Sequence, residues 1–221
     1  MKDKKKSSQI NSESDEQYNK NISKQMKKAG DIYSSQNNYE QALQFYERAA
    51  ELGNCAAQEH LAYLYLSGEI IKKDYTQAYF WLQKAAAQNS AGAKYGLGFM
   101  FENGLGVDPD YDKARILYED SAKNGYYEAY YRLGLFYFTG ILGKTDYNMA
   151  FQLWKIASSS DALNTISVLY FNAKYCLSCM YLYGLGTDKD IEKSEKLWQE
   201  CREYLKQEDK DEIDQLFAEI L

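Results

Sequence analysis

A spacing of 36 residues is the feature that most constrains this chain. Four alanines in equivalent sequence surroundings lie 36 residues apart, and a serine follows the last of them after 44 residues. These markers are Ala42, Ala78, Ala114, Ala150 and Ser194. Self-similarity with a period of roughly 20 to 50 residues is typical of a solenoid, in which each unit buries its apolar face only against its neighbours. The spacing therefore predicts an array of about five units instead of one globular core.

Each unit repeats the same landmarks in two halves. A leucine, a small residue and an aromatic lead to a glycine that closes the first half, at Gly68, Gly104, Gly140 and Gly184. An aspartate opens the second half, at Asp74, Asp110, Asp146 and Asp190. Glycine can end a helix with positive φ, and aspartate can cap the N–H groups of the next helix. Together with a single proline and a lack of β-alternation, the pattern predicts an all-α chain with two helices per unit.

These landmarks resemble those of the Sel-one-like repeat family, a branch of the tetratricopeptide superfamily. Four units match, one of them reading GLGFMFENGLGVDPDYDKARILYEDSA. The first unit has a shorter internal loop and is closer to an ordinary tetratricopeptide repeat. The resemblance implies a right-handed α-solenoid of about five stacked antiparallel helix pairs, and binding of other proteins as its activity.

The composition predicts three regions along the chain. Residues 1–18 are polar, with one aliphatic after the initiator, and are expected to form a disordered tail. Residues 19–207 form the repeat domain, and residues 208–221 carry apolar side chains at helical spacing and are expected to cap the last repeat. Eight extra residues between Ser158 and Ala173 are expected to lengthen the first helix of the fifth pair, or else to alter partner choice.

The overall charge argues against several classes of partner. The net charge is −6, which gives no basic surface for nucleic acid. No apolar run reaches the roughly 20 residues of a membrane helix, and the N-terminus lacks the apolar core of a signal peptide. We therefore expect a cytoplasmic protein, with a monomer favoured and no membrane insertion. Cys55, Cys176, Cys179 and Cys201 follow no regular interval and are expected to be thiols.

Candidate metal and catalytic motifs are weak. Asp108, Asp110, Asp112 and Glu119 have the spacing of part of a calcium loop, but lysine stands where that loop requires glycine. Cys176 and Cys179 form a C-x-x-C without a second ligand pair, and His60 is the single histidine. We therefore expect no metal, no cofactor and no catalytic residues.

The resemblance also implies which residues bind. In the superfamily the first helix of each pair lines the concave face, and positions three before, one after and four after the small landmark residue point inward. Three before stand Tyr95, Tyr131 and Tyr175; one after stand Tyr63, Phe99 and Leu135; four after stand Leu66, Glu102, Phe138 and Leu182. The successive tyrosines are expected to form a ladder that binds a peptide or helix; the alternative is that these rings pack between helices.

The leading prediction is a non-catalytic scaffold or adaptor that binds a protein or peptide through a tyrosine-rich concave surface. One alternative is an inhibitor or immunity-type protein that neutralises a single toxin or enzyme. A second alternative is a hydrolase on a helical-repeat scaffold, because paired carboxylates are recognised only in three dimensions.

Overall fold

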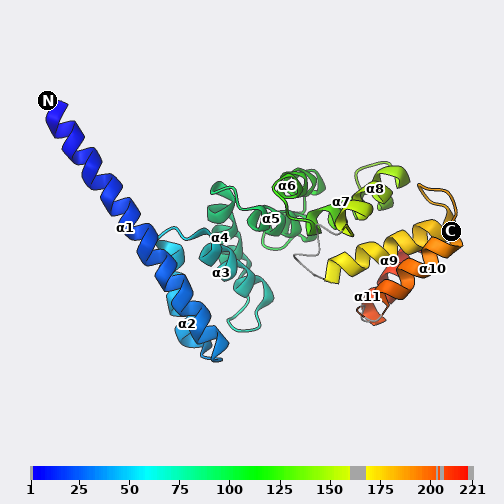
Figure 1. The fold of residues 1–221 in the computed structure, drawn as a ribbon, viewed down its shortest axis with the longest axis horizontal. Helices are drawn as coiled ribbons and strands as arrows, with labels where there is room; N and C mark the ends of the chain where they lie inside the picture. The colour runs from blue at the N-terminus through cyan, green and yellow to red at the C-terminus, as the bar shows by residue number, and fades with distance from the viewer. Residues whose placement is uncertain (1, 160–167, 203, 205–206, 219–221) are drawn as a thin grey trace. The chain divides into compact units, whose positions relative to one another are not determined.

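The chain folds into consecutive α-helices, as the sequence predicts (Figure 1). The computed structural model describes residues 2–159, 168–202, 204 and 207–218, and this part of the chain contains no β-strand. The helices are α1 (Lys2–Ser35), α2 (Tyr39–Glu51), α3 (Cys55–Ser67), α4 (Tyr75–Ala87), α5 (Ala91–Asn103), α6 (Tyr111–Lys123), α7 (Glu128–Thr139), α8 (Tyr147–Ala157), α9 (Val168–Tyr183), α10 (Ile191–Cys201) and α11 (Gln207–Ala218).

Two units make up the chain. The N-terminal unit contains residues 1–100 and 104–108, and the C-terminal unit contains residues 101–103 and 109–221. In the first unit α1 packs on α2, α2 on α3, and α3 on α4; in the second, α6 packs on α7, α7 on α8, α8 on α9, and α9 on α10. Consecutive pairing of antiparallel helices is the arrangement of an α-solenoid and confirms the predicted fold class.

The loop inside each of the last four helix pairs has one repeated geometry. The backbone N–H of the capping aspartate donates to the carbonyl of the aromatic residue nine positions earlier, in the pairs Asp74–Tyr65, Asp110–Phe101, Asp146–Tyr137 and Asp190–Tyr181. These N···O distances lie between 2.8 and 3.0 Å. Each aspartate side chain accepts the backbone N–H three residues later, which satisfies a donor that the helix leaves unpaired. The predicted capping role of the aspartates is confirmed.

The first helix starts earlier than the sequence predicts. The structure continues α1 as a helix to Lys2, through the residues expected to form a disordered tail. Neither proline nor glycine occurs before Gly30, and lysine, glutamate and glutamine in this stretch have good helix propensity. Ser23 is the first buried side chain among those described, so tertiary packing of α1 begins where the repeat domain was expected to start.

A glycine lets the C-terminal unit close around a tryptophan. Trp154 of α8 is fully buried, and its indole Nε1 donates to the carbonyl of Tyr131 at 3.1 Å. A Cβ added at Gly134 of α7 would collide with that indole, including a contact of 2.5 Å to Cδ1. Because Gly134 has no side chain, the indole of Trp154 can occupy this space.

The fifth pair has a longer first helix, for which the eight extra residues predict an extension of about two turns. α9 has 16 residues, whereas α3 and α5 have 13. It begins ten residues before its small landmark Ser178, whereas α5 begins seven before Gly98, so the described lengthening is about one turn. Residues 160–167 of the insertion lie outside the described residues.

Candidate functional site

The predicted binding residues of the N-terminal unit lie on α3 and α5. Tyr63 is 37% exposed, and its hydroxyl donates to the carbonyl of Gly92 at 3.0 Å. Leu66, Tyr95 and Phe99 are half-buried. The hydrogen bond holds the Tyr63 ring in one place while leaving part of it accessible, which suits a contact with a partner.

A polar network joins three helices at one edge of the C-terminal unit. Glu102 accepts a hydrogen bond from the hydroxyl of Tyr118, and its carboxylate lies 3.6 Å from the guanidinium of Arg132. The side chains of Glu102 and Arg132 are both largely shielded from water, so their attraction is screened less than that of a surface pair. Sequence reasoning identified Glu102 but missed Arg132, since Arg132 lies outside the three inward positions of the repeat.

The same network borders an open pocket of about 390 Å³. Three of the predicted binding residues line this pocket, namely Glu102, Tyr131 and Leu135. The pocket is bounded on one side by Ile213 and Gln215 of α11. The structure therefore brings these predicted residues together, and it places the C-terminal helix beside them.

Two further predicted residues of this unit, Phe138 and Tyr175, also lie against α11. Phe138 has no exposed surface, and its ring centroid lies 4.6 Å from that of Phe217. Tyr175 is buried and donates a hydrogen bond from its hydroxyl to the carboxylate of Asp214; burial, followed by this bond, raises the pKa of Tyr175 far above its ordinary value. Leu182 is 36% exposed.

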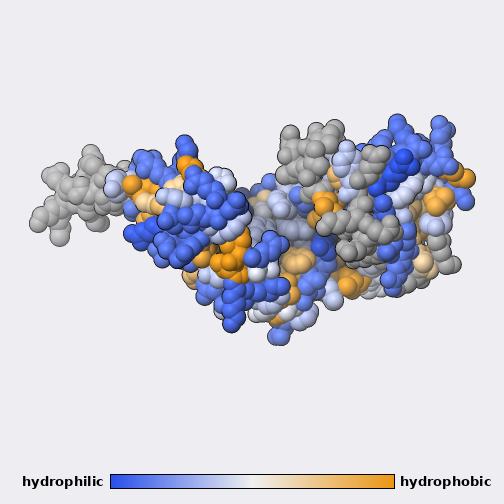
Figure 2. Space-filling view, turned by 90° about the horizontal axis from the view of Figure 1, so that it is seen from below, coloured by the Kyte–Doolittle hydropathy of each residue, from blue (hydrophilic) through white to orange (hydrophobic). Residues whose placement is uncertain are grey.

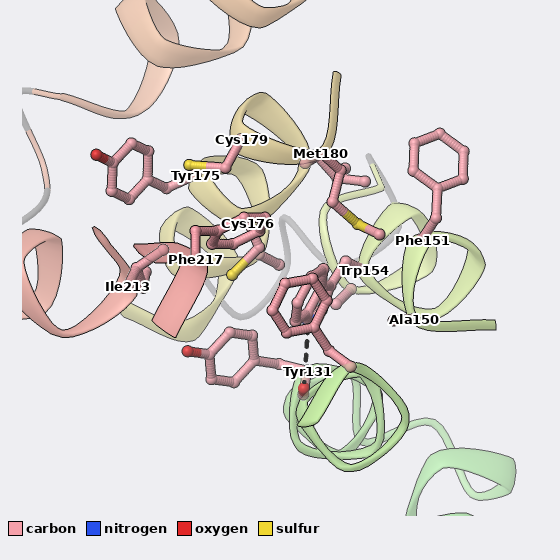
Figure 3. Packing of buried hydrophobic residues seen from close by; sticks show 14 of the residues in the cluster. Tyr131, Ala150, Phe151, Trp154, Tyr175, Cys176, Cys179, Met180, Ile213 and Phe217 are labelled. Atoms are coloured by element: carbon pink, nitrogen blue, oxygen red, sulfur yellow. Dashed lines mark hydrogen bonds between the residues drawn. The ribbon is translucent and has the colours of Figure 1, made fainter. Parts of the chain in front are cut away.

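The C-terminal helix α11, which was expected to cap the last helix, packs on several helices of this unit. Its apolar side chains Ile213 and Phe217 are 3% and 2% exposed and point into a cluster built from α7, α8, α9 and α10 (Figure 3). From α10, Cys201 belongs to this cluster and Trp198 packs against it, and the Nζ of Lys210 lies 5.3 Å from the ring centroid of Trp198. Two apolar side chains four residues apart share one helix face, and the aromatic surface of α7 and α9 buries both.

The seat of α11 coincides with the face that the resemblance marks as concave. We call the residues of α7 and α9 that contact or border α11 the α11 seat. They are Tyr131, Leu135, Phe138, Tyr175, Cys179 and Tyr183. In the C-terminal unit the inward residues Tyr131, Phe138 and Tyr175 are thus buried beside a helix of the same chain instead of forming an open ladder, whereas Leu182 remains exposed.

All four cysteines are free thiols, and three of them are buried. Burial raises the pKa of Cys179 to about 12, with further contributions from the carboxylate of Asp214 and from Cys201. Burial also raises the pKa of Cys201 to about 11. A thiol with so high a pKa has little thiolate at neutral pH, which argues against a nucleophilic role.

Alkylation should therefore distinguish the cysteines. At pH 8, iodoacetamide is expected to modify the half-buried Cys55 at least about tenfold faster than Cys179 and Cys201, because the buried thiols have both less thiolate and less contact with the reagent. Peptide mass spectrometry of timed samples gives the rates, and denatured protein provides the control. Equal rates in the folded protein would contradict the described burial.

The candidate calcium ligands take part in helix contacts. Asp110 caps α6, and hydrogen bonds from Lys113 lower the pKa of its carboxyl. Asp112 and Glu119 both pair with Arg115, at 3.8 and 2.8 Å. Among the described residues no cluster of histidine, cysteine, aspartate or glutamate could hold a metal ion.

The single histidine packs in the N-terminal unit. The ring centroid of His60 lies 4.3 Å from that of Tyr46, and burial lowers the pKa of the imidazole. Tyr46 donates a hydrogen bond to Asp31 at 3.0 Å, and burial together with Asp31 raises its pKa to about 12. This aromatic contact, with a partly buried imidazole, gives His60 a role in packing α3 against α2.

The surface is mostly polar on the face shown in Figure 2, where hydrophobic side chains form small separate patches. Within the described residues, none of the helices combines the length and apolar character needed to cross a membrane.

Helix pairs with repeated caps, joined in sequence, define a helical-repeat protein of the α-solenoid class. The family model for the Sel1 repeat matches residues 25–54, 55–90, 91–126, 128–161 and 172–200. The chain belongs to the Sel1 repeat family, and the match includes the first unit, which the sequence pattern likened to an ordinary tetratricopeptide repeat. Proteins of this family are generally non-enzymatic scaffolds for protein interactions.

Solved structures agree with this assignment. A Sel1 repeat protein from Oxalobacter formigenes is 29% identical with a TM-score of 0.73, over 83% of this chain and 72% of that one. The protein c5321, a protective antigen of uropathogenic Escherichia coli with an SLR fold, is 25% identical with a TM-score of 0.69; the match covers 82% of this chain but 38% of that protein. A putative Sel1 repeat protein from Klebsiella pneumoniae, 22% identical with a TM-score of 0.55 over 88% of this chain and 92% of that one, shares the fold. Comparison with curated proteins gives no match.

Proposed function

We propose that the chain is an adaptor that binds a protein or peptide through the face formed by the first helix of each pair. One observation carries the proposal: in the C-terminal unit this face already holds an amphipathic helix, α11, whose Ile213 and Phe217 are buried on it. A surface that buries an aliphatic and an aromatic anchor from one helix has the properties of a helix-binding groove.

Each unit also has an exposed residue at an inward position outside the α11 seat. Tyr63 on α3 and Leu182 on α9 are exposed at inward positions of the repeat. Tyrosine offers a large apolar contact with a polar tip at small entropic cost, and both features are common at protein interfaces. The four free thiols fit the reducing cytoplasm, where an adaptor of this kind would act.

Site-specific photo-crosslinking tests the proposal. A benzophenone amino acid is placed at Tyr63 or Leu182 on the proposed face, and at Phe80 of α4 or Ile156 of α8 as controls. All four side chains are exposed, so accessibility is matched between the two faces. Covalent adducts with one partner, identified by mass spectrometry, are expected from the first two positions and at least about tenfold less from the controls, because a contact residue lies against the bound chain.

The test compares adducts from the first helices of the pairs with adducts from the second helices. Adducts that form equally well from Phe80 and Ile156 would place the interface on the second helices and contradict the proposal. Each variant is checked by circular dichroism, because the substituted positions are exposed and the helical signal should not change.

A further inference from the structure

The C-terminal helix has the pattern of a ligand for the face on which it lies. Ile213, Asp214 and Phe217 supply an aliphatic anchor, an acid directly after it, and an aromatic anchor four residues after the first. All three contact the α11 seat: both anchors are buried, and the acid accepts the hydroxyl of Tyr175. An amphipathic helix that lays anchors at i and i+4 into a groove is a common mode of peptide recognition.

The aromatic anchor makes the closest contacts. The ring of Phe217 has centroids of Phe138, Tyr183 and Trp154 at 4.6, 6.2 and 6.5 Å. Figure 3 shows Phe217 and Ile213 pointing from α11 toward the helices that carry these rings. The seat therefore has a pocket for one aromatic side chain with an aliphatic site beside it.

An open pocket lies along the other edge of α11. The pocket of about 390 Å³ between α7 and α11 is bordered by Ile213 and Gln215 on one side and by Arg132 and Leu135 on the other. A helix with a larger side chain at the position of Gln215 would cover more of this surface than α11 does.

α11 is also short. It has 12 residues, fewer than a helix needs to be stable by itself in water, so its helical state depends on the seat. It belongs to the same chain as the seat, and a tethered segment acts at a high effective concentration even when its own affinity is modest. A segment of this kind can be replaced by a ligand with better contacts.

Resting on the function proposed above, we propose that α11 is a built-in, displaceable ligand, and that the partner presents an amphipathic helix with the same aliphatic–acid–aromatic spacing, which replaces α11 on the seat. Partner binding then requires release of α11, so the helix lowers the apparent affinity for weak ligands and selects for helices that carry both anchors and the acid.

Release of α11 has a direct chemical readout. Cys179 belongs to the same buried cluster as Ile213 and Phe217, and the carboxylate of Asp214 is near enough to act on its thiol. Displacement of α11 should uncover Cys179 and raise its rate of alkylation, while Cys55, which lies in the N-terminal unit, should react at an unchanged rate.

The test uses the full chain and two peptides. The probe is a fluorescein-labelled peptide of residues 205–221, and the control peptide carries Ile213→Ala and Phe217→Ala. In the full chain, Asp214→Asn weakens the contact of α11 with Tyr175 without altering the seat, and it changes an exposed side chain, so folding should be preserved. Fluorescence anisotropy is expected to show about 3- to 10-fold tighter binding of the probe to Asp214→Asn than to wild type.

A second variant strengthens the comparison. The double change Ile213→Ala and Phe217→Ala in the full chain removes the tethered competitor and is expected to bind the probe at least about tenfold more tightly than wild type. Cys179 should be alkylated faster in both variants than in wild type, and addition of the probe should slow this alkylation again. The control peptide should neither bind tightly nor protect Cys179. If the double variant fails to fold by circular dichroism, the Asp214→Asn result decides.

Three results would overturn the proposal. Equal binding of the probe to wild type and Asp214→Asn, with unchanged alkylation of Cys179, would make α11 a fixed part of the core. Equal binding of the control peptide would show that the anchors do not matter. If light scattering shows that the wild-type protein is a dimer, and the copies exchange α11, the seat binds the α11 of a second copy instead of a partner helix. If crosslinks still form from Tyr63 and Leu182 in any of these cases, the proposed binding function stands without the built-in ligand.

Discussion

Replacing Trp154 with alanine is expected to destabilise the C-terminal unit by about 3–5 kcal/mol, the range measured for large aromatic to alanine changes in cores. The indole is fully buried, packs against Phe138 with centroids 5.1 Å apart, and gives its N–H to Tyr131. Its removal leaves a cavity next to Gly134, which has no side chain to fill it. For a chain of this length the melting temperature should fall by about 6–20 °C.

The measurement is thermal unfolding followed by circular dichroism, with Trp154→Phe as the control. Phenylalanine retains most of the buried apolar area but loses the hydrogen bond to Tyr131, so a smaller loss is expected. A change on the other side of this contact, Gly134→Ala, should also destabilise the unit, because the added methyl group would collide with the indole. If Trp154→Ala melts within about 2 °C of wild type, the described packing of α7 on α8 is wrong.

The repeat architecture could be predicted from the sequence because its signals are local. Asp110 and Asp146 act on backbone groups within four residues, and Gly104 and Gly140 take positive φ at the ends of their own helices. Such signals depend on the chain immediately around them. Repetition of the same signals at 36 residues then determines the order in which helices pair.

The state of the candidate site could not be predicted in the same way, because it depends on contacts between distant residues. Tyr175 and Asp214 are 39 positions apart, and nothing in either neighbourhood indicates their hydrogen bond. The amphipathic pattern of residues 208–221 correctly indicates that the helix must cover an apolar surface. It does not indicate which one, since both the end of α10 and the face of α7 and α9 offer aromatic contacts.

The inward positions of the repeat therefore divide into two groups. Phe138 and Tyr175 occupy positions of the expected binding surface, yet α11 buries both. Leu182, at the position equivalent to that of Phe138, and Tyr63, at another inward position, remain exposed. The position of a residue in the repeat determines which way its side chain points. Whether that side chain is exposed to water depends on other elements of the chain, such as α11.

Truncating a residue of each group should give opposite results. Phe138→Ala is expected to destabilise the C-terminal unit by about 3–5 kcal/mol, because the ring packs on Phe217, Trp154 and Tyr147 and has no exposed surface. Tyr63→Ala is expected to cost less than about 1.5 kcal/mol, since one hydrogen bond to Gly92 is lost and little area is uncovered. For partner binding, Tyr63→Ala should weaken the complex by about 1–3 kcal/mol.

Thermal unfolding and alkylation of Cys179 separate the two effects of the Phe138 change. Phe138→Leu, which retains apolar volume, should recover most of the stability, whereas Phe138→Ala should also loosen α11 and speed the alkylation of Cys179, because Phe217 loses its nearest ring. A Phe138→Ala protein that is as stable as wild type and keeps Cys179 protected would show that α11 does not rest on this ring. In that case Phe138 would belong with Tyr63 on the open binding surface, as the repeat register alone predicts.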